Sequence, residues 1–273
     1  MKSNSLMINN KNGVTYITFP RLSSCGAVRC LFSTKLGGVS TGRYGEMNLS
    51  FNNGDSRGNV LENYKRLCGT EGIELSHLVL SRQTHTSNIK HVTEEDRGTG
   101  IFKPSFSDVD GLITDRSGVA LVTQYADCTP LLFCDPVKKV IATSHAGWRG
   151  TVKEIGKLTV EKMTGEFGCE PENIIAAIGP CIGKCCYEVD DPVISEFRKL
   201  TYLPLDSFIF PKDNGKYMLD LAEANRLILI SSGISPDNID VTDICTCCNA
   251  DVLHSHRATA GKRGNLAAVI ELI

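Results

Sequence analysis

The chain has 273 residues and a formal net charge of −2, and 41% of its residues are hydrophobic while 22% are charged. These values are ordinary for a globular protein, and the charge is too small to hold a nucleic-acid backbone. No stretch is apolar enough for a membrane span, and the polar start at residues 1–11 lacks the apolar core of a signal peptide. We therefore expect a cytoplasmic protein that binds neither nucleic acid nor a membrane.

Strand-like segments dominate the first half of the chain. One segment, residues 59–68, has apolar side chains at helical spacing and predicts a helix. Runs rich in Val, Leu, Ile and Thr predict strands at residues 14–19, 30–34, 78–80, 119–124, 130–134 and 140–143.

Helices become more frequent in the second half. Thr151, with Glu154 three residues later, has the pattern of a capping box and predicts a helix that runs to residue 167 and ends at Gly168. Mixed elements without a regular βαβ rhythm predict one α/β or α+β sandwich domain over residues 1–273, with residues 1–13 as a flexible or edge segment. The remaining predicted elements are a strand at 174–178, helices at 192–200 and 219–231, and a strand at 267–272.

Three residues of metal-ligand type, His85, Cys128 and His145, each come shortly after a predicted strand. If these strands are neighbours in one sheet, their ends bring the three side chains together. Imidazole nitrogen and thiolate sulfur are preferred zinc ligands, and three protein ligands leave a fourth position for water or substrate. The pattern is that of a catalytic zinc site. Three unrelated side chains are the alternative, because no short motif ties these residues together.

The chain contains twelve cysteines. Because no export signal precedes them, we expect free thiols, metal ligands or one nucleophile instead of a disulfide framework. Cys-Thr-Cys-Cys does not match a standard zinc spacing, so we expect buried or incidental thiols in the later clusters, with a second metal site as the alternative. These later clusters are Cys181, Cys185 and Cys186, and Cys245, Cys247 and Cys248.

A series of motifs, in order from about residue 25 to the C-terminus, matches a known family. The motifs are Gly37-Gly38-Val39-Ser40, Met47-Asn48-Leu49, Gly54-Asp55, Gln83-Thr84-His85, Asp108-Val109-Asp110-Gly111-Leu112-Ile113-Thr114, Ala126-Asp127-Cys128-Thr129-Pro130, His145-Ala146-Gly147-Trp148-Arg149-Gly150, Gly179-Pro180-Cys181-Ile182 and Tyr187-Glu188-Val189. On these residues the chain resembles the bacterial YfiH-type proteins, also called the laccase-domain, multicopper polyphenol-oxidase-like or peptidoglycan-editing-factor family.

The resemblance implies a zinc site at His85, Cys128 and His145 and a layered α/β/β/α fold related to cysteine-hydrolase-like toxins. It also implies a purine nucleoside phosphorylase that takes adenosine, inosine, guanosine or methylthioadenosine, with adenosine deamination as a second activity. The family's Ser-aromatic-Arg-Arg and Thr-Gly-Arg strings differ here. They read Ser255-His256-Arg257-Ala258 and Ala260-Gly261-Lys262-Arg263. This leaves the role of that segment open, with Arg257 as a candidate for substrate binding.

Such a reaction needs groups that hold phosphate and move protons. The guanidinium fork of Arg149 matches phosphate oxygens, and a helix that begins at Thr151 would add backbone N–H groups. An ordinary ion-paired arginine is the alternative. Asp110 and Asp127 are the acid/base candidates, although either could instead hold a turn or orient a ligand.

Two amide side chains, Asn48 and Gln83, are candidates for hydrogen bonds to the nucleoside, and the alternative is turn capping, which is common for amides at strand ends. Three other functions stay open. Two histidines and a cysteine also suit copper, although six histidines are few for a multicopper oxidase. Cys128 with His145 as its base would suit a metal-free cysteine hydrolase, and a cell-wall-related metal-binding module is the non-enzymatic alternative. We expect a monomer or a small homo-oligomer with zinc, or copper, as its cofactor and nucleoside and phosphate as its ligands.

Overall fold

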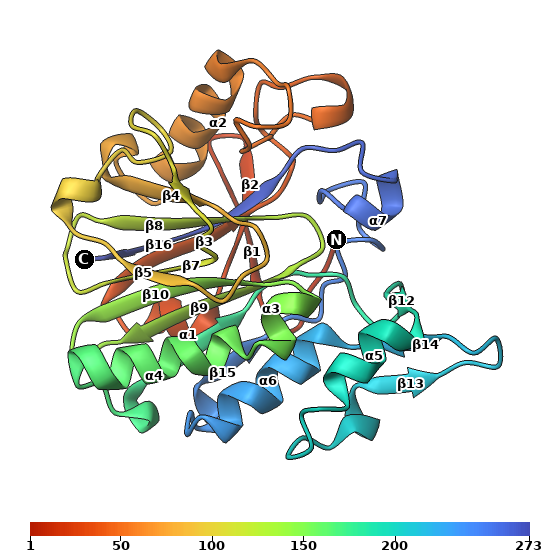
Figure 1. The fold of residues 1–273 in the computed structure, drawn as a ribbon. Helices are drawn as coiled ribbons and strands as arrows, with labels where there is room; N and C mark the ends of the chain where they lie inside the picture. Colours follow the sequence, from red (N-terminus) through yellow and green to blue (C-terminus); the bar gives the residue numbers. More distant parts are fainter.

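Two large β-sheets lie face to face in the computed structural model, which describes residues 1–273 (Figure 1). Neighbouring strands of the first sheet are antiparallel except at β4, which is parallel to both β8 and β6. The edge strand β1 pairs only with β2. In spatial order the seven strands are β1 (Met7–Lys11), β2 (Val14–Thr18), β3 (Val28–Ser33), β16 (Leu266–Leu272), β8 (Ala120–Tyr125), β4 (Leu78–Arg82) and β6 (Phe106–Ser107).

The second sheet is also mixed, because β15 is parallel to β11 and β5 is parallel to β7. Its six strands are β15 (Ile239–Val241), β11 (Ile175–Ile178), β9 (Thr129–Asp135), β10 (Val140–Ala146), β7 (Gly111–Thr114) and β5 (Ile89–His91). A third, small antiparallel sheet contains β12 (Glu188–Val189), β14 (Tyr217–Leu219) and β13 (Ile209–Pro211).

The main hydrophobic core lies between the two large sheets. Phe32 and Leu121 of the first sheet belong to the same buried cluster as Leu112, Leu132 and Ile141 of the second. Each of these five side chains is fully buried, and burial of a side chain of this size contributes roughly 1.5–3 kcal/mol. Apolar packing between the sheets therefore holds the ends of β8 and β10 at fixed positions relative to each other.

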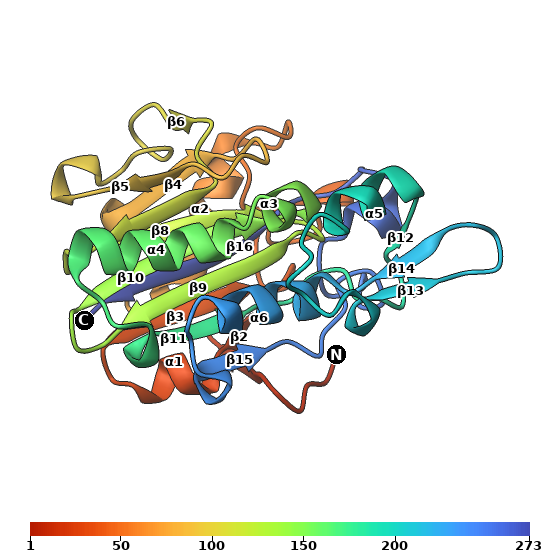
Figure 2. The ribbon, with the colours of Figure 1, turned by 60° about the horizontal axis from the view of Figure 1, so that its bottom comes forward.

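Helices cover the outer faces of both sheets (Figure 2). Helix α2 (Arg57–Gly69) packs Val60, Tyr64 and Leu67 on the first sheet, and α4 (Ile155–Phe167) and α6 (Leu221–Ser231) cover the second. The prediction of a mixed α/β fold is confirmed. The other helices are α1 (Pro20–Ser24), α3 (Trp148–Val152), α5 (Asp191–Phe197) and α7 (His256–Thr259). None of the helices combines the length and apolar character that a membrane crossing requires.

The helix predicted from Thr151 to residue 167 is two helices. Thr151 lies inside α3, where its backbone N–H donates to the Gly147 carbonyl at 2.8 Å, so it is not an N-cap. The chain bends at Glu154, whose φ of 55° is left-handed, and α4 begins at the next residue. The predicted end is confirmed, because Gly168 closes α4 with a φ of 65°, a conformation that glycine adopts without steric cost.

Candidate functional site

His85, Cys128 and His145 come together from three segments of the chain. His85 stands three residues after β4 with a left-handed φ of 64°, and Cys128 lies in the turn that joins β8 to β9. His145 lies inside β10, although the sequence pattern had placed it after the strand. The ligand atoms of the three side chains all lie within 4.8 Å of one another, and Cys128 Sγ is 3.9 Å from His85 Nε2. We name these residues the histidine–cysteine group.

The expectation that their strands are neighbours in one sheet is wrong. Strands β4 and β8 belong to the first sheet, whereas β9 and β10 belong to the second. The turn at residues 126–128 therefore crosses from one sheet to the other, and the group lies where the two sheets meet. Apolar runs along a sequence predict strands but do not assign them to one sheet or to two stacked sheets.

Asp110 is fully buried beside this group and fixes its geometry. Its carboxylate accepts hydrogen bonds from the backbone N–H groups of Thr84 (3.1 Å), His85 (3.0 Å) and Thr86 (2.8 Å), and from the Thr86 hydroxyl (2.8 Å). It also contacts Nδ1 of His145 at 2.8 Å. Burial opposes the ionised form, but the hydrogen bonds from His145 and Thr86 outweigh it and lower the pKa of Asp110 to about 2.

These contacts favour the alternative that Asp110 orients a ligand over the predicted role as catalytic acid or base. Its oxygens are already engaged, it has no exposed surface, and its low pKa keeps it ionised at neutral pH. Its contact with Nδ1 leaves Nε2 of His145 free to face a ligand. Asp110 thus holds the His145 ring in one orientation, as a carboxylate commonly does for a histidine that binds a metal.

Cys128 and His145 shift each other's pKa in opposite directions. Burial opposes the Cys128 thiolate, but the charge and hydrogen bond of His145, together with the hydrogen bond of His85, lower the pKa of Cys128 to about 6. Burial also opposes the imidazolium, yet the Cys128 charge and the Asp110 hydrogen bond raise the pKa of His145 to about 9. In the metal-free protein the pair is therefore a thiolate beside an imidazolium at neutral pH.

The donor set of the histidine–cysteine group fits a metal ion. Zinc binds thiolate sulfur at about 2.3 Å and imidazole nitrogen at about 2.0–2.1 Å, so two atoms 3.9 Å apart are within reach of one ion. Asp110 supplies the carboxylate that such a histidine commonly contacts. His85 and Cys128 also line a pocket, so one side of the group is open to a small molecule.

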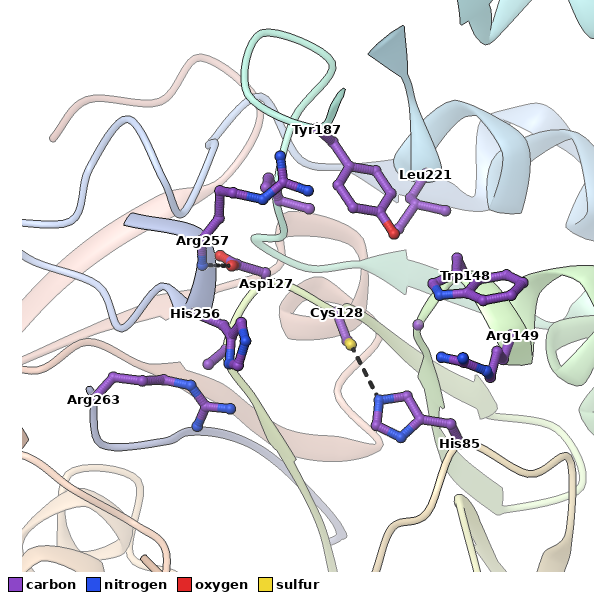
Figure 3. Close-up of a pocket in the computed structure, with 13 residues that line it drawn as sticks. His85, Asp127, Cys128, Trp148, Arg149, Tyr187, Leu221, His256, Arg257 and Arg263 are labelled. Carbon is purple, nitrogen blue, oxygen red and sulfur yellow. Dashed lines mark hydrogen bonds between the residues drawn. The ribbon is translucent and has the colours of Figure 1, made fainter. Parts of the chain in front are cut away.

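A pocket of about 290 Å³ opens beside the group (Figure 3). We name it the arginine-lined pocket, because Arg149, Arg257 and Arg263 stand on different sides of Cys128. A ligand with a negative charge and a flat ring suits such surroundings. The other lining residues include two aromatic side chains; in full they are His85, Ala126, Asp127, Gly147, Trp148, Ile182, Tyr187, Leu221 and His256.

The three arginines differ in what they already bind. Arg149 is exposed, lies 4.3 Å above the Trp148 ring and has no hydrogen bond or ion pair. Arg263 uses Nη1 for the Gly264 carbonyl and the Asn265 side chain, while its buried Nε has no partner. Burial lowers the pKa of Arg263, against the opposing charges of two pocket residues. Arg149 and Arg263 are therefore the cations with free donors.

Arg257 lines the pocket and also supports one of its walls, so its role in substrate binding stays a prediction. Its two terminal nitrogens donate to the carbonyls of Cys186 (3.1 Å) and Glu188 (3.0 Å). The guanidinium also lies 5.4 Å from the Tyr187 ring. Its backbone N–H donates to Asp127 at 2.7 Å, so Arg257 ties together two walls of the pocket.

Asp127, the second acid/base candidate, does line the pocket. One carboxylate oxygen accepts from the Thr246 hydroxyl at 2.6 Å and the other from the Arg257 N–H. The predicted helix start at Thr151 is wrong, because α3 begins at Trp148 and Arg149 lies in its first turn.

A second pocket of about 270 Å³ shares His85, Cys128 and Arg263 with the first. Gln83 lines it, but its amide nitrogen donates to the Gln124 carbonyl at 2.9 Å and its oxygen accepts from the Gln124 N–H at 2.7 Å. Gln83 therefore keeps only part of its hydrogen-bonding capacity for a ligand.

The predicted contact of Asn48 with the nucleoside finds no support in either pocket. Asn48 is fully buried and lines neither pocket. Its amide nitrogen donates to Ser50, Asn53 and Asp55, and its oxygen accepts from the backbone N–H of Asn265 at 3.0 Å. The amide holds two loops together, as a buried polar group with every partner satisfied.

Sequence reasoning missed Arg263 and Tyr187 as pocket residues. Tyr187 stands in one of the matched motifs, but no spacing rule brings it near Cys128. Arg263 lies in the C-terminal segment whose Gly-Arg spacing differs from the family pattern. That difference was the sequence signal that could have pointed to Arg263 as a pocket residue.

Four of the six later cysteines favour the alternative of a second metal site over incidental thiols. Cys185 and Cys186 of one cluster meet Cys245 and Cys248 of the other, and all four sulfur atoms lie within 4.8 Å of one another. We name these residues the four-cysteine group. They could bind a metal ion, and Cys245 and Cys248 have the two-residue separation common among zinc ligands.

Comparisons with known proteins agree with this architecture. The family model described as "Multi-copper polyphenol oxidoreductase laccase" matches residues 29–273. The chain is 37% identical to the "Purine nucleoside phosphorylase YlmD" of Bacillus subtilis, with 88% of this chain and 86% of the relative covered. It is 35% identical to "Adenosine deaminase RL5" from an unknown prokaryotic organism, with 83% and 87% covered. The crystal structure of a hypothetical protein YfiH from Bacillus licheniformis has a TM-score of 0.92 and 34% identity, with 97% of this chain and 99% of that chain covered.

Proposed function

This chain belongs to the family described as multi-copper polyphenol oxidoreductase laccase, also known as the YfiH-type or laccase-domain family, and on that premise we propose that it is a purine nucleoside phosphorylase. Its substrates are purine nucleosides, namely adenosine, inosine, guanosine and methylthioadenosine, together with phosphate. Adenosine deamination is a second activity, in line with the printed name of one relative. The observation that carries the proposal is the arginine-lined pocket, whose free cations and aromatic walls adjoin the histidine–cysteine group.

We propose that His85, Cys128 and His145 hold one zinc ion, with copper as the alternative. The support is their donor types, their mutual distances and the contact of Asp110 with His145. When bound, such an ion supplies Lewis-acid polarisation of an oxygen atom. The protein's own side chains do the remaining work.

Phosphorolysis replaces the bond from the sugar to the base with a bond from the sugar to phosphate. A phosphate oxygen bonds to the anomeric carbon, the carbon–nitrogen bond breaks, and the departing base nitrogen takes a proton. Arg149 and Arg263 have free N–H groups that match an anionic nucleophile. Trp148 and Tyr187 provide aromatic faces for the purine ring.

Asp127 is our candidate for the group that relays protons. It lines the pocket next to Cys128, unlike Asp110. Donors from Thr246 and Arg257 hold its carboxylate in one orientation. Deamination also needs a proton to reach the departing amine, so one carboxylate can serve both reactions.

A metal-free cysteine hydrolase is the second candidate, and one observation favours it. Cys128, His145 and Asp110 have the order nucleophile, base and orienting carboxylate, and the lowered pKa of Cys128 favours the reactive thiolate. This arrangement, between two sheets flanked by helices, also motivates the proposed relation to cysteine-hydrolase-like toxins. No contact in the pocket favours a copper oxidase or a cell-wall binding module.

The test measures products and metal on the same preparation. We expect ribose-1-phosphate from inosine only when phosphate is present, and inosine from adenosine with or without phosphate. We expect Cys128→Ala to lose both products, whereas Asp108→Asn, a change in an exposed loop, keeps them. If no product of the wild type depends on phosphate, the phosphorylase proposal is wrong. Stoichiometric copper at the site would favour the oxidase alternative.

A further inference from the structure

The four-cysteine group joins two loops that are distant in the sequence. Cys185 and Cys186 lie in the turn before β12, whereas Cys245 and Cys248 lie in the loop between β15 and α7. The Cys248 Sγ atom is 3.4 Å from the Sγ atoms of both Cys185 and Cys186. Cys245 is buried, Cys186 is half-buried, and the other two are exposed. The cluster is therefore at the surface, with one sulfur anchored inside.

The arrangement of the sulfur atoms suits one shared ion better than two disulfides. A disulfide pairs each sulfur with a single partner at about 2.05 Å. Here Cys248 Sγ is equally close to two sulfurs, and all four sulfur atoms lie within 4.8 Å of one another. A tetrahedral zinc site with bonds of about 2.3 Å has sulfur atoms about 3.8 Å apart, which is within the observed range.

Backbone groups near the cluster are placed to stabilise negative sulfur. The N–H groups of Gly183 and Cys248 donate to Cys245 Sγ at 3.2 Å and 3.5 Å. Cys186 and Tyr187 both donate their N–H groups to the Gly183 carbonyl, which closes the first turn. Cys245 and Cys248 have the C-x2-C spacing of structural zinc sites, whereas Cys185 and Cys186 are adjacent in the sequence and lie in a closed turn.

We propose that Cys185, Cys186, Cys245 and Cys248 together bind one zinc ion as a structural site. Each thiol gives up its proton when it binds, and no redox change is involved. Four protein ligands leave no open position for a substrate, so this ion supports the structure and takes no part in the chemistry. The inference stands on these four residues alone and does not depend on the proposed nucleoside chemistry.

Such an ion would fix one wall of the arginine-lined pocket. Thr246, between two of the ligands in sequence, donates its hydroxyl to Asp127 at 2.6 Å. The Cys186 carbonyl accepts from Arg257 at 3.1 Å, and Tyr187 directly follows Cys186. Joining the two loops therefore holds Asp127, Arg257 and Tyr187 at constant separations.

Metal analysis of the protein, purified without chelator and without oxygen, tests this proposal by giving the number of zinc ions per chain. We expect about two zinc ions in the wild type, one for each group. Cys248→Ser and Cys185→Ser should each retain about one, and His85→Ala should also retain about one. Cys247→Ser is the matched control, because this half-buried cysteine stands in the same loop outside the group, and it should keep two.

A cobalt(II) titration of the metal-free Cys128→Ala chain decides the matter even if the serine variants fail to fold. Because Cys128 is replaced, the four-cysteine group is the remaining cluster of thiolates in that chain. Intense near-ultraviolet sulfur–cobalt absorption that saturates at one equivalent of cobalt therefore supports the site. Absence of this absorption overturns the proposal. Equal zinc in wild type and folded Cys248→Ser, or a disulfide between these cysteines in freshly purified protein, overturns it as well. None of these readouts measures enzyme activity, so failure here is distinct from failure of the proposed function.

Discussion

The histidine–cysteine group and the four-cysteine group contain similar ligand atoms in different surroundings. The first lies between two packed sheets, and a buried carboxylate orients one of its histidines. It offers three ligands and opens onto two pockets. The second lies on surface loops, offers four sulfurs and lines neither of those pockets. A reactive metal centre differs from a structural one in the number of protein ligands and in its access to a pocket, more than in whether it contains cysteine.

Removal of one ligand from each group is the change with the largest expected effect. His145→Ala should lower the rate of phosphorolysis by about a thousandfold or more, because a bound ion is worth several kcal/mol of charge stabilisation. Cys248→Ser should lower the melting temperature but keep the rate at 25 °C within about tenfold, since a structural ion contributes to folding. Steady-state rates and thermal melts measure both effects. Equal rate losses in the two variants would break the comparison.

Cys128 and Cys185, one thiol from each group, should also differ in how they respond to pH in the metal-free protein. His145 and His85 lower the pKa of Cys128 from 9.0 to about 6, whereas burial and Cys248 raise the pKa of Cys185 to about 12. The thiolate is the form that reacts, so alkylation of Cys128 should fall only as the pH drops through about 6. Cys185 should react appreciably only at strongly alkaline pH. Peptide mass spectrometry after iodoacetamide treatment measures each site.

The variant His145→Ala is the control for this pH experiment, because it tests the cause of the lowered pKa of Cys128. His145→Ala removes the imidazolium beside the thiolate, so the midpoint for Cys128 should move upward while that for Cys185 stays constant. If Cys128 keeps its midpoint near 6 in this variant, the charge of His145 is not the cause of the shift.

A smaller effect is expected from the residue that positions His145. Asp110→Asn removes the charge and brings an amide N–H against three backbone donors. We expect zinc at the histidine–cysteine group to bind about 10–100-fold more weakly, the usual result of losing such a contact. Competition with a chelator measures the affinity. The neighbouring Asp108→Asn should bind zinc as the wild type does, and zinc at the four-cysteine group should be unaffected by either change.

The smallest expected effect concerns the phosphate. Arg149→Lys keeps the charge but loses the planar fork, so the apparent affinity for phosphate should fall by about tenfold, the scale of a charged hydrogen bond worth ~1.5–3 kcal/mol. Deamination of adenosine should change less, because it needs no phosphate. Arg43→Lys is the control, since Arg43 also stacks on an aromatic ring but lies outside both pockets. Equal losses in both reactions would assign Arg149 a general supporting role.

Local sequence patterns predicted most elements, because strands and helices depend on nearby side chains. The run at 119–124 became β8 with a shift of one residue, and Gly168 ended α4 as expected. The break at Glu154 escaped prediction, because a left-handed residue of this type has no clear sequence signature. The one-sheet assumption failed, because strand pairing depends on contacts between distant segments.

By itself, the sequence determined the mixed fold, the three residues of the histidine–cysteine group through the family motifs, and the candidate role of Arg149. Only the tertiary structure decided that Asp110 orients His145, that Asn48 joins loops, and that Arg263 reaches the pocket. It also decided that cysteines about 60 residues apart lie together in one cluster. The physical reason is the same in each case. A side chain's role follows from which hydrogen-bond donors, charges and ligands surround it, and long-range packing of the two sheets and their loops brings those neighbours together.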